Sequence, residues 1–301
     1  MFPFLAARTA IFVALAGFVA TYLGILVSSL RGSRGPGEPR RSPSASHVAT
    51  GFVTNFLDTL GIGSFATSTA IFKFWKMLPD ELYPGTLNVG HTLPTVFQAF
   101  IYIAVIAVDP TTLVLLIGSA VVGAWFGAGL VASFSRRAVQ LGMGAALLTA
   151  AAAMLMSQLK WFPVGGTALE LHGWRLAIGI VGNLVLGAIM TLGIGLYAPC
   201  ITLISLLGMD PAAAFPIMMG SCAFLMPVAS ARFIRRRAYS APVALGLAVG
   251  GLLGVPLAAF VVKSLPLTAL RWLVIVVVVY AAVLMLRSAR QEALVRPPSA
   301  A

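Results

Sequence analysis

Residues 59–63 read Thr-Leu-Gly-Ile-Gly, and residues 191–195 repeat these five residues 132 positions later. Three further identities keep this offset: Ala66 with Ala198, Pro79 with Pro211, and Pro84 with Pro216. Both copies interrupt apolar stretches. A glycine break at matched places in two halves of a chain is typical of the binding centre of a membrane transporter. The repeat therefore predicts a duplicated fold whose functional centre lies at the two breaks.

The composition is that of a membrane protein. Of the 301 residues, 59% are hydrophobic and 9% are charged, whereas a soluble domain carries about 25% charged residues. The apolar runs are about 20 residues long, which is the length that crosses a bilayer as a helix. They lack the alternation of a membrane β-barrel strand. We therefore expect an all-α polytopic membrane protein.

The formal net charge of +12 comes mostly from short arginine clusters beside the apolar runs. The clusters are Arg31, Arg34, Arg40 and Arg41; Arg136 and Arg137; Arg232 and Arg235 to Arg237; and Arg287, Arg290 and Arg296. This distribution sets the orientation of a membrane protein, and no nucleic-acid recognition module accompanies it. We expect the lipid bilayer, and not nucleic acid, as the partner of these charges.

The first apolar run extends from about residue 9 to residue 30 and follows Arg8. It is longer than the apolar part of a signal peptide, which has about 7–15 residues. The small-residue pattern at 14–16 resembles a cleavage site but lies in the middle of the run. The sequence favours an uncleaved anchor helix at 1–30, with cleavage as the alternative.

Placing every arginine cluster on the cytoplasmic side fixes the topology. Further apolar runs cover about 86–108, 111–132, 138–157, 212–231, 241–262 and 267–286. If each crosses once, the segment 47–76 begins and ends inside, and the segment 173–208 begins and ends outside. Each leg of the first segment has about 14 residues, or about 21 Å of helix, which is less than the roughly 30 Å hydrocarbon core.

These lengths predict two re-entrant hairpins that enter from opposite sides. The fold class is thus two inverted repeats, each a glycine-broken hairpin plus three transmembrane helices, after an extra N-terminal helix. If all hairpin legs cross fully, the chain has eleven spans and the same topology. The predicted domains are an anchor helix 1–30, a basic cytoplasmic loop 31–46, a first repeat 47–157, a linker 158–172, a second repeat 173–287 and a polar cytoplasmic tail 288–301.

The tips of the two hairpins are the predicted anion site. The second leg of a hairpin begins a new helix whose first N–H groups are free and whose dipole end is positive, which suits an anion. The alternative is that the glycines serve close helix packing. The predicted site residues at the tips are Gly61, Gly63, Ser64, Thr67, Ser68, Gly193, Gly195, Tyr197 and Cys200.

Two ionisable residues lie in or beside the apolar runs. Asp58 precedes the first break, where the second repeat has Met190, and an intramembrane acid is a functional candidate. It is a proton carrier, the anchor of a cation, or a cap for the second leg. His91 shares a helical face with Asn88 and titrates near neutral pH, unless a neighbouring carbonyl simply satisfies it. We add Asn88, His91 and Ser221 to the predicted anion site, and assign proton coupling to Asp58 and His91.

Other chemistry has no motif in this chain. There is no phosphate-binding glycine loop with its lysine, no H-E-x-x-H or C-x-x-C pair, and no G-x-S-x-G sequence. The two cysteines, Cys200 and Cys222, form no disulfide framework. We expect no ATP hydrolysis, no cofactor and no metal, and hence no enzyme.

The two glycine-containing segments resemble the TauE/SafE family of membrane permeases, the sulfite and organosulfonate exporters. The resemblance rests on TNFLDTLGIGSFATSTAIFKFWKMLPDELYPGTLNVGHTLPT at 54–95 and GAIMTLGIGLYAPCITLISLLGMDPAAAFPIMMGSCAFLMPVASARF at 187–233. It implies a multi-pass protein of the bacterial inner membrane that moves a small sulfur-containing or carboxylate anion without ATP.

We therefore predict a secondary transporter for a small organic or sulfur-containing anion, such as sulfite, a sulfonate or a carboxylate, with proton coupling as an added hypothesis. The nearest alternative is an anion channel, and a membrane-embedded enzyme or assembly factor is a further one. These features predict neither the direction of transport nor the oligomeric state.

Overall fold

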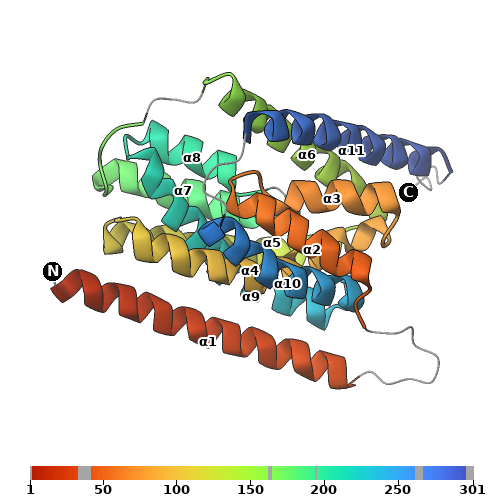
Figure 1. Ribbon diagram of the computed structural model, residues 1–301, viewed down its shortest axis with the longest axis horizontal. Helices are drawn as coiled ribbons and strands as arrows, with labels where there is room; N and C mark the ends of the chain where they lie inside the picture. Colours follow the sequence, from red (N-terminus) through yellow and green to blue (C-terminus); the bar gives the residue numbers. More distant parts are fainter. Residues whose placement is uncertain (1, 33–41, 162–164, 194, 262–266, 296–301) are drawn as a thin grey trace, which may run out of the picture.

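A computed structural model describes residues 2–32, 42–161, 165–193, 195–261 and 267–295, and every named element in these ranges is a helix (Figure 1). The first half contains α1 (Phe2–Gly32), α2 (Ala45–Thr59), α3 (Ser64–Trp75), η1 (Asp80–Leu82), α4 (Tyr83–Val105), α5 (Pro110–Val131) and α6 (Arg136–Gln158). The second contains α7 (Gly173–Met190), α8 (Tyr197–Leu206), η2 (Pro211–Ala213), α9 (Ala214–Arg235), α10 (Ala241–Pro256), η3 (Leu257–Val261) and α11 (Leu267–Val295).

Seven helices within the described ranges are long and apolar enough to cross a membrane. They are α1, α5, α6, α7, α9, α10 and α11. This confirms the prediction of a polytopic, all-helical membrane protein. The number of spans agrees with the prediction of seven. One span differs, however, because the prediction included α4 and the structure has α7 in its place.

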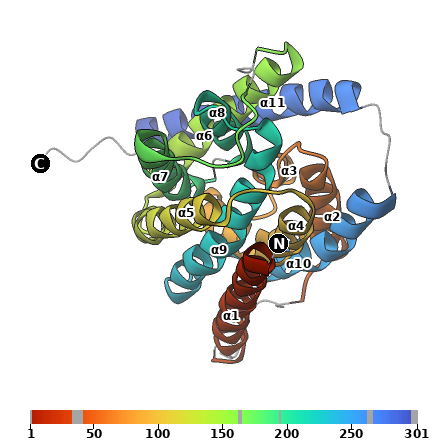
Figure 2. The same cartoon turned by 90° about the vertical axis from the view of Figure 1, so that its left-hand side faces the viewer.

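The difference between the predicted and the observed spans has a physical cause in the composition of α4 and the length of α7. Helix α4 carries buried polar side chains, among them Thr86, Asn88, His91 and Gln98, which lower its hydropathy. It lies inside the bundle against α2, α3, α9 and α10 (Figure 2), where protein rather than lipid surrounds these groups. Helix α7 has 18 residues, or about 27 Å, so the first leg of the second hairpin nearly reaches the thickness of the bilayer core.

Helices α4 and α9 pack together in opposite directions. The Thr86 hydroxyl near the start of α4 accepts a hydrogen bond from the Ser240 N–H, just beyond the end of α9, at 2.9 Å. Further along, the hydroxyls of Thr92 and Ser230 lie 3.2 Å apart. The antiparallel pair forms the middle of the bundle, and its buried residues join most of the helices into one core.

Each hairpin packs mainly on a helix from the other half of the chain. The first leg α2 lies on α10, and α7 lies on α5. Glycines allow the close approach. A Cβ atom added to Gly51 would stand 2.5 Å from the Leu247 carbonyl oxygen, and one added to Gly250 would collide with the Val48 carbonyl. The two halves are therefore interlocked.

One end of the bundle carries Arg136 and Arg137 at the start of α6 and Arg232 and Arg235 at the end of α9, and it is called here the arginine-rich face. Arg136 at the start of α6 lies 3.6 Å from the Glu81 carboxylate and 3.9 Å from that of Glu292 near the end of α11. The Arg232 guanidinium lies 3.9 Å from the centre of the Trp125 ring. The turns at Asp109 and Asp210 lie at the opposite end, where residues 168–169 join them by backbone hydrogen bonds.

A buried ion pair ties η1 to its neighbours at the arginine-rich face. The Lys73 ammonium and the Gln140 amide each contact Asp80 Oδ2 at 2.8 Å. Burial alone would raise the pKa of Asp80, but the hydrogen bonds from Lys73 and Gln140 outweigh it and hold this pKa below its ordinary value. Lys73 is thus paired within the protein.

The N-terminal helix α1 is packed onto the bundle. The Tyr22 hydroxyl is buried and donates to the Val89 carbonyl at 2.8 Å, and Leu15 is fully buried against the core. Leu15 lies within the pattern that resembles a cleavage site. Figure 1 shows α1 extending along one side of the bundle.

Substituting Gly250 by Ala should destabilise the protein, because the added methyl meets the Val48 backbone. Overpacking of this kind costs about 1–3 kcal/mol, so the thermal unfolding midpoint in detergent should fall by about 2 °C or more. Gly118, which lies 132 residues earlier and has open space at its Cβ position, is the matched control. If Gly118→Ala lowers the midpoint as much as Gly250→Ala does, the close contact between α2 and α10 is wrong.

Substituting Asp80 by Asn should cost about 2 kcal/mol at pH 7, since hydrogen bonds to a buried charge are worth about 1.5–3 kcal/mol. A carboxyl with a lowered pKa stabilises the fold above its unfolded value of about 3.9 and loses this contribution as the pH falls through its folded value. The difference between Asp80→Asn and wild type should therefore vanish in acid. Glu81→Gln, which breaks an exposed pair, should change the midpoint little at any pH; equal losses in both variants would contradict the role of Asp80.

Candidate functional site

The first glycine break separates two helices as the sequence predicts. Helix α2 ends at Thr59, and α3 begins at Ser64. Between them Gly61 has φ +82° and Gly63 has φ +90°, a region that glycine enters at little cost. The prediction that these glycines interrupt the helix is confirmed.

The second break has a related form. Helix α7 ends at Met190, and α8 begins at Tyr197. Gly193 has φ +113°, while no heavy atom stands within 4 Å of a Cβ placed on Gly195. Ile194 and the side chain of Tyr197 lie outside the described part of the structure, so the predicted contact of Tyr197 with a ligand stays a prediction.

The two breaks meet inside the bundle. Gly63 and Ser64 from the first tip and Gly195 from the second line one small cavity of about 30 Å³, together with Asp58. This volume holds about one water molecule. The remaining lining residues are Phe65, Thr95, Met190, Leu196, Met219, Cys222 and Met226.

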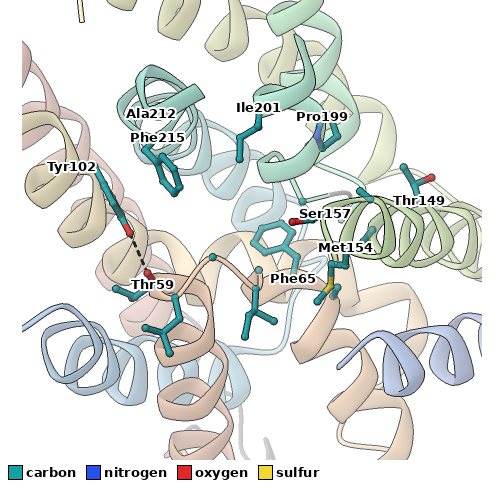
Figure 3. Close-up of a pocket in the computed structure, with 18 of the residues that line it drawn as sticks. Thr59, Phe65, Tyr102, Thr149, Met154, Ser157, Pro199, Ile201, Ala212 and Phe215 are labelled. Atoms are coloured by element: carbon teal, nitrogen blue, oxygen red, sulfur yellow. Dashed lines mark hydrogen bonds between the residues drawn. The ribbon is translucent and has the colours of Figure 1, made fainter. Parts of the chain in front are cut away.

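A larger cavity of about 530 Å³ is also lined by both tips. Figure 3 shows Phe65 from the first hairpin, Ile201 from α8 and Phe215 from α9 around it. The other lining residues are Thr59 to Gly63, Ala66, Tyr102, Ile106, Thr149, Ala150, Ala153, Met154, Ser157, Gly195, Pro199 and Ala212. The size and the apolar walls are those of a site for a small organic ligand.

Asp58 lies beneath the first tip with 4% of its surface exposed. Its Oδ1 accepts a hydrogen bond of 2.7 Å from the main-chain N–H of Ser64, the first residue of α3. The Gln98 amide and the Ser64 hydroxyl also hydrogen-bond this carboxylate. Asp58 thus has the geometry of a cap for the second leg, in which a negative charge meets the positive end of a helix.

Gln98 and Tyr102 of α4 hold the end of the first leg, and sequence reasoning did not select them. The Gln98 amide donates to the Thr59 hydroxyl at 2.9 Å, and the Tyr102 hydroxyl donates to the Thr59 carbonyl at 3.0 Å. The signal that identifies them is the continuation of the polar stripe from His91 at steps of three and four residues.

His91 joins three helices through side-chain hydrogen bonds. Its Nδ1 lies 3.0 Å from Asn55 Oδ1 of α2, and its Nε2 lies 2.9 Å from the Ser68 hydroxyl of α3. Because the Asn55 amide nitrogen donates to the Gly51 carbonyl, its oxygen faces the ring, so neutral His91 carries its proton on Nδ1 and accepts from Ser68. The partners are side chains rather than the neighbouring carbonyl of the alternative interpretation.

Four other predicted site residues line neither cavity. The Thr67 hydroxyl donates to the carbonyl of Gly63, which directly precedes α3, at 2.9 Å. Asn88 donates to the Pro84 carbonyl and reaches the Thr191 carbonyl at 3.3 Å. Ser221 accepts from the Asn183 amide at 3.0 Å, and Cys200 is fully buried. The structure thus brings Asp58, Gly61, Gly63, Ser64 and Gly195 together around the two cavities, and the ligand roles of all the predicted site residues stay predictions.

Within the described residues, no group of three or more His, Cys, Asp or Glu side chains is arranged to hold a metal ion. Comparison with protein-family models, with curated proteins and with solved structures gives no match. No relative therefore assigns a function to the two tips.

Proposed function

We propose that this protein is a secondary transporter that moves a small organic or sulfur-containing anion across the bacterial inner membrane. One observation carries the proposal: two glycine-bounded tips from sequence-matched segments line the same 530 Å³ cavity. Broken helices whose ends meet in the middle of a bundle are the usual binding centre of such carriers. The sequence resemblance to the TauE/SafE permeases supports the same class.

The chain is, on this proposal, a pair of inverted repeats. A shift of 132 residues moves the starts of α2 to α6, at 45, 64, 83, 110 and 136, to 177, 196, 215, 242 and 268. Helices α7 to α11 start at 173, 197, 214, 241 and 267. The matched helices α4 and α9 run in opposite directions, as an inverted repeat requires. The pairing of α2 with α10 mirrors that of α7 with α5.

The walls of the larger cavity favour an anion with a hydrocarbon body. Among the described lining residues, Tyr102 alone has an ionisable side chain, and the other described walls consist of apolar side chains, small hydroxyls and backbone. Main-chain N–H groups at the tips are the donors available to an oxyanion. Phe65 and Phe215 would cover an apolar ligand body, which an inorganic ion such as sulfite lacks.

The location of the cavity supports an outward-open state. Its lining includes Ile106 after α4, Ser157 in the last turn of α6 and Ala212 in η2, all remote from the arginine-rich face. That face is cytoplasmic if the positive-inside rule holds, and so is the C-terminal tail. Rocking of the two repeats around the tips would expose the same centre to the cytoplasm.

Substitution of either tip glycine by Leu should strongly reduce transport. In proteoliposomes, Gly63→Leu strains a positive φ, and Gly195→Leu fills the cavity. Uptake of labelled benzenesulfonate should fall at least about tenfold in each, the effect of losing roughly 1.4 kcal/mol of binding. Gly17→Leu, on the exposed side of α1, is the control.

The same assay distinguishes a carrier from a channel. A carrier saturates and shows counterflow, in which unlabelled benzenesulfonate inside the vesicles drives uptake of label. Flux that neither saturates nor responds to counterflow would assign a channel. Full flux in both glycine variants would show that the tips are not the binding centre.

Phe215→Ala should weaken benzenesulfonate binding about tenfold and leave sulfite binding almost unchanged. A buried aromatic contact is worth about 1.5–3 kcal/mol when fully lost, and sulfite has no apolar body to cover. Isothermal titration with both anions measures this difference. Phe126→Ala, which removes a side chain that is 71% exposed on α5, is the matched control. Equal losses for the two anions in Phe215→Ala would exclude the apolar wall as a determinant of specificity.

A further inference from the structure

At the first tip, the carboxylate of Asp58 already occupies a main-chain donor that an external anion could use. The main-chain N–H of Ser64 lies at the start of α3 and at the 30 Å³ cavity, and its chain neighbours Gly63 and Phe65 line both cavities. This N–H donates to the Asp58 carboxylate at 2.7 Å. A second anion cannot take this donor while the ionised carboxylate holds it, because the two like charges would share a buried site. The first tip is therefore closed to an external anion as long as Asp58 is charged.

The second tip has no such internal anion from the matched position. Met190 stands where the offset of 132 residues places the counterpart of Asp58, and both side chains line the 30 Å³ cavity between the tips. The site is thus nearly symmetric in its backbone and asymmetric in its charge. The asymmetry makes Asp58 the group that distinguishes the two tips.

Gln98 supplies an independent observation at the same carboxylate. Its side chain is fully buried and its amide bonds Asp58, while its Oε1 accepts no hydrogen bond from the described residues. A buried acceptor without a donor costs about 1–3 kcal/mol. Half a turn of the amide exchanges its oxygen and nitrogen, and a protonated Asp58 then gives Oε1 the missing donor.

We propose that Asp58 is the proton site of the carrier and that the transported anion replaces it at the Ser64 N–H only after Asp58 has taken a proton. The inference rests on the proposed anion transport. In this step a proton from water adds to one carboxylate oxygen, the carboxyl O–H bonds Gln98 Oε1, and the freed N–H donates to the anion. One proton and one anion therefore enter the same carrier state, which makes the protein a symporter.

Few other ionisable groups face Asp58. Tyr102 and Cys222 interact with its charge from α4 and α9, and both types of group ordinarily titrate above pH 8. His91 lies on α4 and is bonded to Asn55 and Ser68. Helix α10 has no ionisable residue, and Glu292 of α11 pairs with Arg136 at the arginine-rich face. Apart from Asp58, His91 is therefore the group whose type ordinarily titrates between pH 5 and about 8. The experiment needs a His91 variant as a control.

The test is benzenesulfonate binding to the purified full-length protein from pH 5 to 8. A sulfonate stays ionised throughout, so any pH dependence belongs to the protein. Uptake of one proton with each anion raises the apparent dissociation constant about tenfold per pH unit wherever Asp58 is ionised. Asp58→Asn, a neutral isostere with both a donor and an acceptor, should bind with less than about twofold change over this range.

Two control variants separate Asp58 from other effects. Asp109→Asn alters a carboxylate that accepts a main-chain N–H at the same 2.7 Å, at the start of α5, and should keep the wild-type slope. His91→Gln should keep it as well. A second measurement needs no variant: in weakly buffered solution with a pH indicator, wild-type protein should take up about one proton per benzenesulfonate bound.

The outcomes are distinguishable. Absence of binding by wild type at every pH would overturn the anion carrier itself and the coupling with it. Binding by wild type without pH dependence or proton uptake would overturn the coupling alone. A wild-type slope in Asp58→Asn, or its loss in His91→Gln, would place the proton elsewhere.

Discussion

A helix that stops inside a bilayer must satisfy the backbone groups that it leaves open, because the surrounding hydrocarbon cannot bond them. At the first tip the Gly61 and Ile62 N–H groups turn back onto the Asp58 and Leu57 carbonyls. The Thr59 carbonyl accepts from Tyr102, and the Ser64 N–H donates to the Asp58 carboxylate. The rest of the bundle serves to bring these partners to the tip.

This requirement explains the unusual composition of α4. Three side chains along its polar stripe, those of His91, Gln98 and Tyr102, form hydrogen bonds with the first hairpin. Such side chains would be unfavourable against lipid, so α4 must be covered on all sides, and the surrounding helices provide the cover. The same residues that lower the hydropathy of α4 therefore fix the shape of the first tip.

Local features of the sequence predict much of this arrangement, since glycine conformation, hydropathy and arginine clusters are properties of short segments. The breaks at 61–63 and 193–195 and the position of Asp58 beside the first tip followed from such signals. The partners of His91 did not, because Asn55 and Ser68 meet it only after three helices have packed. The cavity wall from Met154 and Ser157 of α6 carries no local signal either, since Met156 between them is exposed. Helix α7 was expected to be one leg of a re-entrant hairpin, and its 18 mostly apolar residues give it nearly the length of a span.

The interlocked hairpins also constrain how the protein is made. Helix α2 ends at Thr59, but its main partner α10 begins only at Ala241. At about 5–20 residues per second, the ribosome needs roughly 10–40 s to supply that partner. Helices α5 and α7, by contrast, are separated by α6 and one linker. The first hairpin, with its buried acid, must therefore wait for α10 during most of translation, so the tip that is synthesised first is completed after the second hairpin has met α5.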